Sequence, residues 1–180
     1  MDIRIVNKST NPNPTYGTKG SAACDLQANL PAKEVREYAG KPLTQGFDIV
    51  SIDDKFDAIR LFPGGRCAIP TGIHIEIPET YHADIRARSG LAVNHGIQVL
   101  NGTGLIDCDY TGEIMVILHN TDRCRAFEIT HGMKIAQMLI AKTNKIAWVP
   151  VKGLKQTERG DGGFGSTDKP KDENTNTLTV

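Results

Sequence analysis

The sequence predicts an all-β fold of the sandwich or jelly-roll kind, and three observations favour it. Apolar and polar residues alternate with period two in many short segments, which is the pattern of half-buried strands. Turn motifs such as Pro63-Gly64-Gly65 and Asn101-Gly102 separate these segments at roughly regular spacing. The 180 residues include 18 glycines, 9 prolines and 39% hydrophobic residues, a balance typical of one turn-dense globular domain.

The clearest expected strand lies between Pro70 and Pro78. The isoleucines at 73, 75 and 77 share one face of an extended chain, while His74 and Glu76 share the other. The same alternation predicts further short strands with few helices between them, in chain order at residues 3–6, 24–28, 82–87, 97–100, 114–118, 127–129, 135–141 and 145–149.

Two segments interrupt this pattern. Residues 33–60 mix charges with apolar residues at helical spacing (Val35, Tyr38, Ala39, then Ile52, Phe56, Ile59), so we expect an inserted excursion within a β domain spanning 1–152. Residues 153–180 are rich in Gly, Lys and Asp, a composition that cannot bury enough apolar surface to order itself. The sequence therefore predicts a mobile C-terminal arm.

Charge and cysteine content exclude several classes of function. Lys and Arg total 21 and Asp and Glu total 21, which argues against a protein that coats nucleic acid or an anionic membrane. The four cysteines form no Cys-x-x-Cys pair, as expected for free thiols in a reducing compartment. The N-terminus lacks a signal-peptide pattern and no apolar run approaches the ~20 residues of a membrane span. We expect a cytoplasmic protein that contacts neither nucleic acid nor membrane.

Three segments carry residues suited to chemistry. In Arg86-Ala-Arg88-Ser89-Gly90-Leu91, a strand end runs into a turn whose guanidinium, hydroxyl and backbone amides could converge on a phosphate. The alternative is a solvated basic strand end. A small phosphorylated substrate remains compatible with zero net charge, because a local site needs only a few cations.

The second segment, residues 101–113, is expected to be a tight hairpin with glycines at 102, 104 and 112. Glycines allow close approach of the backbone, whose donors and acceptors can read the edge of a flat base. Asp107 and Asp109 point to opposite faces if the chain is extended, so one of them faces a given site. That carboxylate could orient a water molecule, or it could serve as an Asx-turn residue.

The third segment, residues 158–167, bears Arg159 and Phe164 among glycines. It is not a P-loop, because Gly165 is followed directly by Ser166 with no lysine between them. A flexible segment with one cation and one aromatic ring suits a lid that folds over a ligand; the alternative is a disordered linker.

Taken together and in order, five stretches make the chain resemble the dUTP diphosphatase (dUTPase) family: residues 21–28, 88–91, 101–113, 132–137 and 159–167. The resemblance implies a jelly-roll-like distorted β-barrel that assembles as a homotrimer, with each active site built from neighbouring subunits. It implies hydrolysis of dUTP to dUMP and pyrophosphate, which limits uracil in DNA and supplies dUMP for dTMP synthesis.

The resemblance also implies roles for individual residues. Asp107 would activate water against the α-phosphate. Mg²⁺ would be held mainly by the triphosphate, with Asp25 acting on it through water. The backbone near Asn101 and residues 105–107 would read uracil, and the Tyr110 ring would exclude a 2′-hydroxyl. The substrate-binding set would be Arg88, Ser89, Gly90, Asn101, Gly104, Leu105, Ile106, Tyr110, Met115, Gln137, Arg159, Phe164, Gly165 and Ser166.

Departures from the family pattern leave these groups in place. Ala87 replaces the usual proline, and Lys134 replaces the more usual arginine. A deoxycytidine triphosphate deaminase, which is similar in fold, would need a glutamate where this chain has Ile117. A nucleotide sensor or binding module without catalysis is a further alternative, and the 33–60 excursion is the candidate surface for a protein partner.

Overall fold

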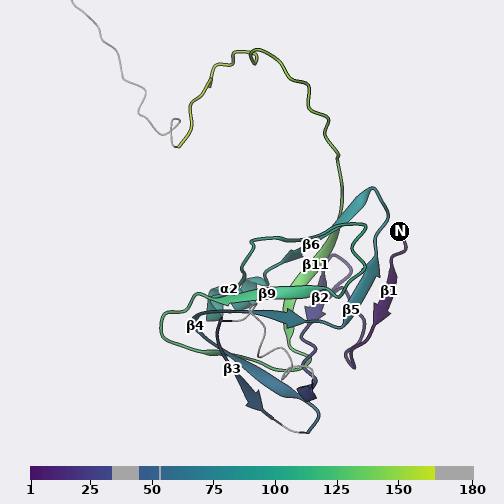
Figure 1. Ribbon diagram of the computed structural model, residues 1–180, viewed down its shortest axis with the longest axis vertical. Coiled ribbons are helices and arrows are strands. Elements are labelled where there is room, and N and C mark those ends of the chain that lie inside the picture. The colour runs from purple at the N-terminus through teal and green to yellow at the C-terminus, as the bar shows by residue number, and fades with distance from the viewer. Residues whose placement is uncertain (34–44, 53, 165–180) are drawn as a thin grey trace, which may run out of the picture. The chain divides into compact units, whose positions relative to one another are not determined.

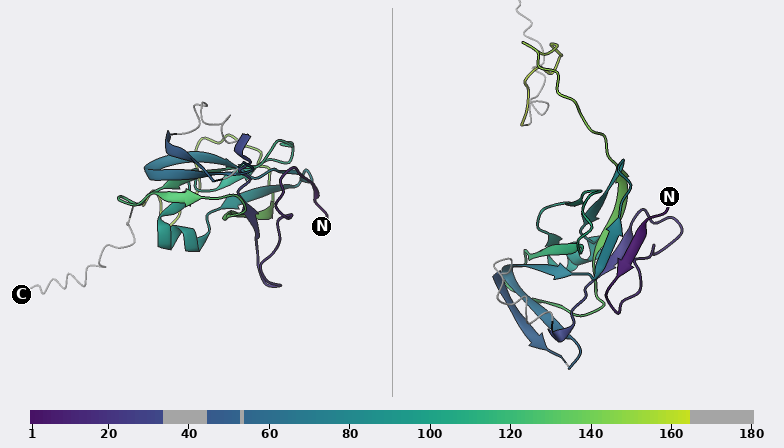
Figure 2. Two further views of the ribbon diagram at one scale, coloured as in Figure 1. Left: turned by 90° about the horizontal axis from the view of Figure 1, so that it is seen from below. Right: turned by 45° about the vertical axis from the view of Figure 1, so that its right-hand side comes forward.

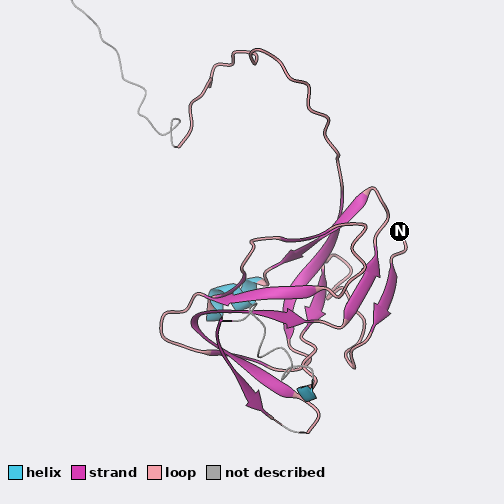
Figure 3. Ribbon diagram, in the orientation of Figure 1, coloured by secondary structure: helices cyan, strands magenta, loops and turns pink. Residues whose placement is uncertain are grey.

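Strands dominate the computed structural model, which describes residues 1–33, 45–52 and 54–164 (Figures 1 and 3). The chain divides into two compact units, Met1–Asn144 and Lys145–Val180. The elements of the first unit are β1 (Arg4–Asn7), β2 (Cys24–Gln27), β3 (Gln45–Ser51), β4 (Asp57–Pro70), β5 (Ile73–Glu76), β6 (Tyr81–Arg86), α2 (Ser89–His95), β7 (Ile97–Val99), β8 (Gly104–Ile106), β9 (Met115–Asn120), β10 (Phe127–Ile129) and β11 (Lys134–Lys142).

These strands confirm the all-β prediction and most of its expected positions. The isoleucines at 73, 75 and 77 are buried, while Glu76 on the opposite face is exposed. The strand expected at residues 145–149 is wrong, because that segment has no strand and its side chains are exposed. Alternation alone is insufficient there, since a strand also needs a partner for its backbone hydrogen bonds.

The strands pair into three sheets. One contains β10, β4, β9 and β7 in that order, with β3 also paired to β4; a second has the order β2, β11, β6, β8; and β1 pairs with β5. Side chains from the two larger sheets form one buried cluster, for example Leu26 and Ile85 with Ile69 and Leu118. Each such fully buried side chain contributes about 1.5–3 kcal/mol. β8 and β9 lie in different sheets around this core.

Part of the expected excursion consists of strands. β3 and the first half of β4 extend as an antiparallel ribbon (Figures 1 and 2), so the helical spacing of Ile52 and Ile59 does not correspond to a helix. The turn expected at residues 63–65 is an irregularity inside β4: Phe47 pairs with Leu61, but Gln45 pairs with Arg66. A Cβ at position 65 would collide with the Gly46 carbonyl oxygen, which explains the glycine there. Val35, Tyr38 and Ala39 lie outside the described residues.

The remaining global expectations concern membranes and thiols. In the described parts of the chain, no helix is both long enough and apolar enough to cross a bilayer. All four cysteines are free. Burial raises the pKa of the Cys67 thiol to about 12, so this side chain is an unreactive part of the core.

Candidate active site

The segment expected to be a tight hairpin instead crosses between the two larger sheets. β8 pairs with β6, whereas β9 pairs with β4 and β7, and β8 and β9 do not pair with each other. We call residues 107–114 the crossover loop. It begins with a turn in which the Tyr110 N–H donates to the Asp107 carbonyl oxygen at 3.1 Å. Hairpin pairing is absent because β8 is in the sheet of β2, β11 and β6, whereas β9 is in the sheet of β4.

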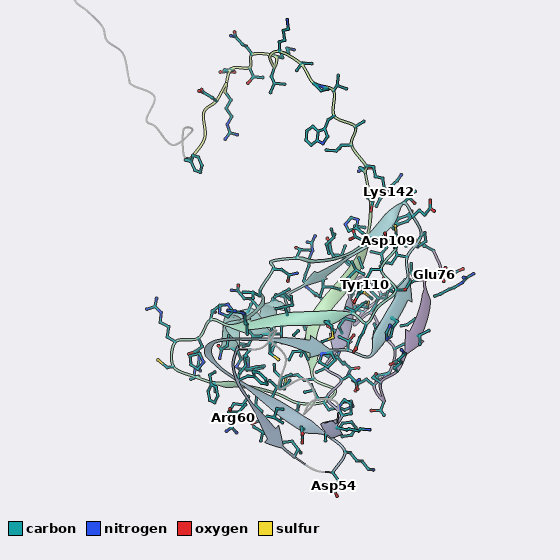
Figure 4. All side chains as sticks on the ribbon, viewed as in Figure 1. Asp54, Arg60, Glu76, Asp109, Tyr110 and Lys142 are labelled. Carbon is teal, nitrogen blue, oxygen red and sulfur yellow. The ribbon has the colours of Figure 1, made fainter. Side chains whose placement is uncertain are left out.

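A cleft of about 190 Å³ lies beside this loop. Its lining comes from the end of β8, the crossover loop and the start of β9: Leu105, Ile106, Asp107, Tyr110, Glu113 and Met115. Asp107 therefore faces the cleft, while Asp109 is exposed and not part of the lining. Figure 4 labels Asp109 and Tyr110 on the loop. Five of the six lining residues were expected as site residues from sequence, and Glu113 was not.

The Tyr110 ring is held at the mouth of the cleft by its own loop. Its hydroxyl donates to the Glu113 carbonyl oxygen at 2.8 Å. A Cβ at Gly112 would lie 2.6 Å from both Cζ and Oη of the ring, so the ring packs on backbone that must lack a side chain. The ring is nevertheless 45% exposed, which leaves it accessible to a ligand.

A second group of expected site residues surrounds Asp25 on β2. Arg88 Nε donates to Oδ1 of Asp25 at 3.1 Å, and Lys134 Nζ lies 2.8 Å from Oδ2. Arg88 also donates to the Lys134 carbonyl oxygen at 3.2 Å. The Asp25 side chain is 20% exposed, so this carboxylate and two cations form a partly solvated cluster.

The other expected phosphate ligands lie next to this cluster. Ser89 and Gly90 are exposed at the start of α2, where a turn was expected, and Arg88 is the preceding N-cap residue. Backbone N–H groups in the first turn of a helix have no partner within the helix. Gln137 on β11 pairs with Asp25 across the sheet, and its side chain donates to the Ala87 carbonyl oxygen at 3.1 Å.

The register of β6 separates the Asp25 cluster from the cleft. Ile106 of β8 pairs with Ala83, and Gln137 of β11 pairs with Arg86. Asp107 comes one residue after Ile106, and Arg88 comes two residues after Arg86, in opposite directions along β6. At about 3.3 Å per residue, the backbones of Asp107 and Arg88 are therefore about 20 Å apart along this strand. The two residues also lie toward opposite edges of β6. One chain therefore does not bring Asp107 and Arg88 to the same phosphate.

The remaining expected residues are more dispersed. Asn101 is exposed in the turn between β7 and β8 and does not line the cleft, whereas Gly104 is buried at the start of β8. Arg159 and Phe164 belong to the second unit, where Arg159 Nε donates to the Gly162 carbonyl oxygen at 2.8 Å. Phe164 is exposed. Gly165 and Ser166 lie outside the described residues.

Near this cluster, the Asp25 carboxylate could help to hold a metal ion only if water and substrate phosphates supplied the other ligands. No group of three His, Cys, Asp or Glu side chains in the described residues could hold a metal. Mg²⁺ keeps several waters and is commonly bound by one or two carboxylates together with substrate phosphates. A single partly exposed carboxylate suits that mode and no tighter one.

Sequence reasoning identified Lys134 only as a replacement for arginine and did not assign Glu113. The ion pair between Lys134 and Asp25 depends on the register of β2 against β11, which no local pattern encodes. Glu113 gave a weak signal, because it follows Gly112 at the end of the Asp107 segment.

Comparison with known proteins agrees with this geometry. The dUTPase family model matches residues 37–168. The deoxyuridine 5'-triphosphate nucleotidohydrolase of Anaplasma marginale (strain St. Maries) is 40% identical over 165 residues, covering 92% of this chain and 95% of that protein. The same-named protein of Rickettsia prowazekii (strain Madrid E) is 48% identical over 139 residues, 77% and 88% of the two chains.

A solved structure has the same fold. A mutant dUTPase of Staphylococcus bacteriophage 80alpha, determined with dUpNHpp, matches with a TM-score of 0.67 and 18% identity, covering 92% of this chain and 98% of that one. This likeness confirms the expected jelly-roll-like β fold. The family model and the sequence relatives, which match most of its length, show that the chain belongs to the dUTPase family.

Proposed function

We propose that the cleft binds the deoxyuridine part of dUTP and that Asp107 activates the water that attacks the α-phosphate. As a member of its family, the protein hydrolyses dUTP to dUMP, with pyrophosphate as the other product. The observation that carries the proposed site is the position of the Asp107 carboxylate, which lines a cleft together with the Tyr110 ring.

Uracil would be recognised mainly by backbone groups of β8. This strand is at the end of its sheet, after β6, so its outer edge offers N–H and C=O groups that no strand among the described residues uses. Such groups match the donor and acceptor pattern of a flat base. Leu105, Ile106 and Met115 would enclose the base, and the narrow space between them would exclude the methyl group of thymine.

Tyr110 would select the deoxyribose. Its ring is fixed by the hydroxyl bond to Glu113 and by the bare backbone of Gly112. A rigid ring against C2′ leaves no space for a ribose hydroxyl, and a pocket that rejects a group by contact needs such rigidity.

Asp107 would accept the proton of the attacking water. A carboxylate within hydrogen-bonding distance of water both orients it and increases its nucleophilicity. The leaving pyrophosphate needs its charge neutralised, and bound Mg²⁺ supplies that neutralisation. Within the chain, Asp25 would hold the waters around the metal, and Arg88, Ser89, Gly90 and Gln137 would hold the phosphates.

The phosphate ligands would come from a second copy of the chain. Within one chain, the separation of about 20 Å along β6 prevents Arg88 from reaching the phosphate group that the water at Asp107 would attack. Assembly as a homotrimer with shared sites removes this problem, because the β6 end of one subunit can face the cleft of another.

Residues 153–180 would complete the site by closing over the bound nucleotide. Arg159 is an exposed cation suited to the γ-phosphate, and Phe164 is an exposed ring suited to stacking on the base. Gly165 and Ser166 would add backbone and hydroxyl contacts. Closure would exclude bulk water from the reacting phosphate.

A pyrophosphate-release assay with dUTP, dTTP, dCTP and UTP, each with and without Mg²⁺, tests the proposal. We expect efficient release from dUTP alone, with strong dependence on Mg²⁺. Equal release from dUTP and dTTP would contradict base selection by the cleft. Ammonia release from dCTP, measured in a parallel assay, would indicate a deaminase instead.

A further inference from the structure

The crossover loop is anchored to the turn between β4 and β5. The Gly72 N–H donates to Oε1 of Glu113 at 2.7 Å. The His74 ring lies with Nδ1 3.1 Å from the Thr111 carbonyl oxygen; because a carbonyl only accepts, Nδ1 carries the proton. Both bonds join the loop that bears Tyr110 to residues 71–74, which continue into the buried isoleucines of β5.

Glu113 is the residue at which this anchor meets the Tyr110 ring. Its side chain binds Gly72, and its carbonyl oxygen accepts the Tyr110 hydroxyl bond at 2.8 Å. Glu113 thus links the hydroxyl bond of the ring directly to the β4–β5 turn, beside the bonds that Thr111 and Ile114 make with the same segment. Gly112 lies directly beneath the ring, so small movements of this backbone move the ring.

We propose that Glu113 is a positioning residue that sets the discrimination between dUTP and UTP, acting through the Tyr110 ring. This inference rests on the proposed contact of Tyr110 with the sugar. Glu113 lines the same cleft as Asp107, but its Oε1 is engaged by the Gly72 amide, which suits an anchor. When the bond between Glu113 and Gly72 is lost, the backbone beneath the Tyr110 ring is held less firmly. The ring can then move aside and admit a 2′-hydroxyl.

The main test compares kcat/KM for dUTP and UTP in Glu113→Ala and Glu113→Gln. Removing one hydrogen bond of this kind should lower the dUTP-to-UTP ratio about five- to tenfold in Glu113→Ala. Glu113→Gln keeps an oxygen that accepts from Gly72 and should keep the parent ratio. Glu76→Ala is the matched control, because Glu76 is an exposed carboxylate on β5 paired with Arg4, and it should leave the ratio unchanged.

Two further variants separate positioning from general loss of structure. Tyr110→Phe removes only the hydroxyl that binds the Glu113 carbonyl, so it should lower the ratio in the same direction even if Glu113→Ala folds poorly. In a Tyr110→Ala background, Glu113→Ala should have no additional effect on the ratio, because the ring through which it acts is gone.

The outcomes distinguish this inference from the proposed function. Suppose that Glu113→Ala and Tyr110→Phe keep the parent dUTP-to-UTP ratio while Tyr110→Ala lowers it. The anchor then has no influence on selectivity and the inference is overturned, although the role of Tyr110 stands. Equal falls in kcat/KM for both substrates would overturn it too, since they indicate only structural damage. A parent protein that does not hydrolyse dUTP would overturn the proposed function itself.

Discussion

Arg88 Nε lies 3.1 Å from Oδ1 of Asp25, joining the N-cap of α2 to β2, the strand at one end of the second sheet. The other oxygen of the same carboxylate lies 2.8 Å from Lys134 Nζ. Asp25 therefore determines where both cations point. A triphosphate bound as proposed would meet cations already oriented by a carboxylate, which is a form of preorganisation.

Substitution of Asp25 by Asn should weaken the response to Mg²⁺. The variant loses the charge that would hold metal-bound water and that orients Arg88, so KM for dUTP should rise and the Mg²⁺ concentration for half-maximal rate should increase. Stability should fall by only about 1 kcal/mol, because both cations are partly exposed. Magnesium titrations of the steady-state rate measure this effect. Glu128→Gln removes a comparable ion pair to Arg60 and should leave the titration unchanged.

Asp107→Asn should lower kcat by several powers of ten while binding of a non-hydrolysable dUTP analogue persists, because an amide cannot accept the proton of water. Rapid-quench turnover and calorimetric binding measure the two quantities. The control is Asp109→Asn, which changes a neighbouring exposed carboxylate outside the cleft. Similar turnover in both variants would remove Asp107 from the mechanism.

Mixed assemblies test whether sites are shared between copies. Asp107→Asn and Arg88→Ala chains should each be nearly inactive alone. If they are unfolded together in equal amounts and refolded, about one quarter of the sites in a randomly mixed oligomer combine an intact Asp107 with an intact Arg88 from different chains. Pyrophosphate release should recover to that extent. No recovery would mean that each chain supplies both residues of its own site.

Asn120 should be essential for stability, because it is fully buried and satisfies three backbone groups. Its Nδ2 donates to the carbonyl oxygens of Leu61 and Arg125, and its Oδ1 accepts from the Asp122 N–H. Asn120→Ala removes all three bonds from the interior and should cost about 2–4 kcal/mol. Urea denaturation measures the loss, with exposed Asn94→Ala as the control. A change below 1 kcal/mol, roughly the value of one hydrogen bond, would contradict this account.

His131 should make stability depend on pH. Its Nδ1 accepts a hydrogen bond from the Leu30 N–H at 3.1 Å, so the ring is neutral there, and burial lowers the pKa of His131 from its ordinary 6.5. The unfolded chain then binds the proton first as pH falls. The contribution of His131 is complete above pH 6.5 and declines below it.

Urea midpoints at about pH 8 and about pH 5.5 measure this dependence. The parent should lose more stability between the two conditions than His131→Gln, whose side chain does not titrate. Equal losses in the two proteins would show that other groups account for the acid sensitivity.

Local patterns predicted the fold where a strand has one buried face. β5 was evident because its isoleucines alternate with polar residues. The first half of β4 was not, since Pro63, Gly64 and Gly65 interrupt the strand and are normally turn residues. β8 has only three residues and begins with glycine, so it gave no strand signal of its own.

The candidate site was partly predictable for the same reason. Asp107 and Tyr110 stand out because glycines surround them in a short segment. The surroundings of these two residues could not be predicted, because the crossover between sheets and the anchor at Gly72 depend on pairing between distant residues. The separation of Asp107 from Arg88 likewise follows from strand register, which is set by the whole core.

Both halves of β4 pair with strands that come much later in the chain, and this affects how the protein acquires its structure. Ile59 pairs with Ile129, and Cys67 pairs with Leu118. Each contact closes a long loop whose entropy is lost before the contact stabilises anything. Folding should therefore take milliseconds to seconds, and a nascent chain on the ribosome cannot complete its central strand until β9 and β10 have been synthesised.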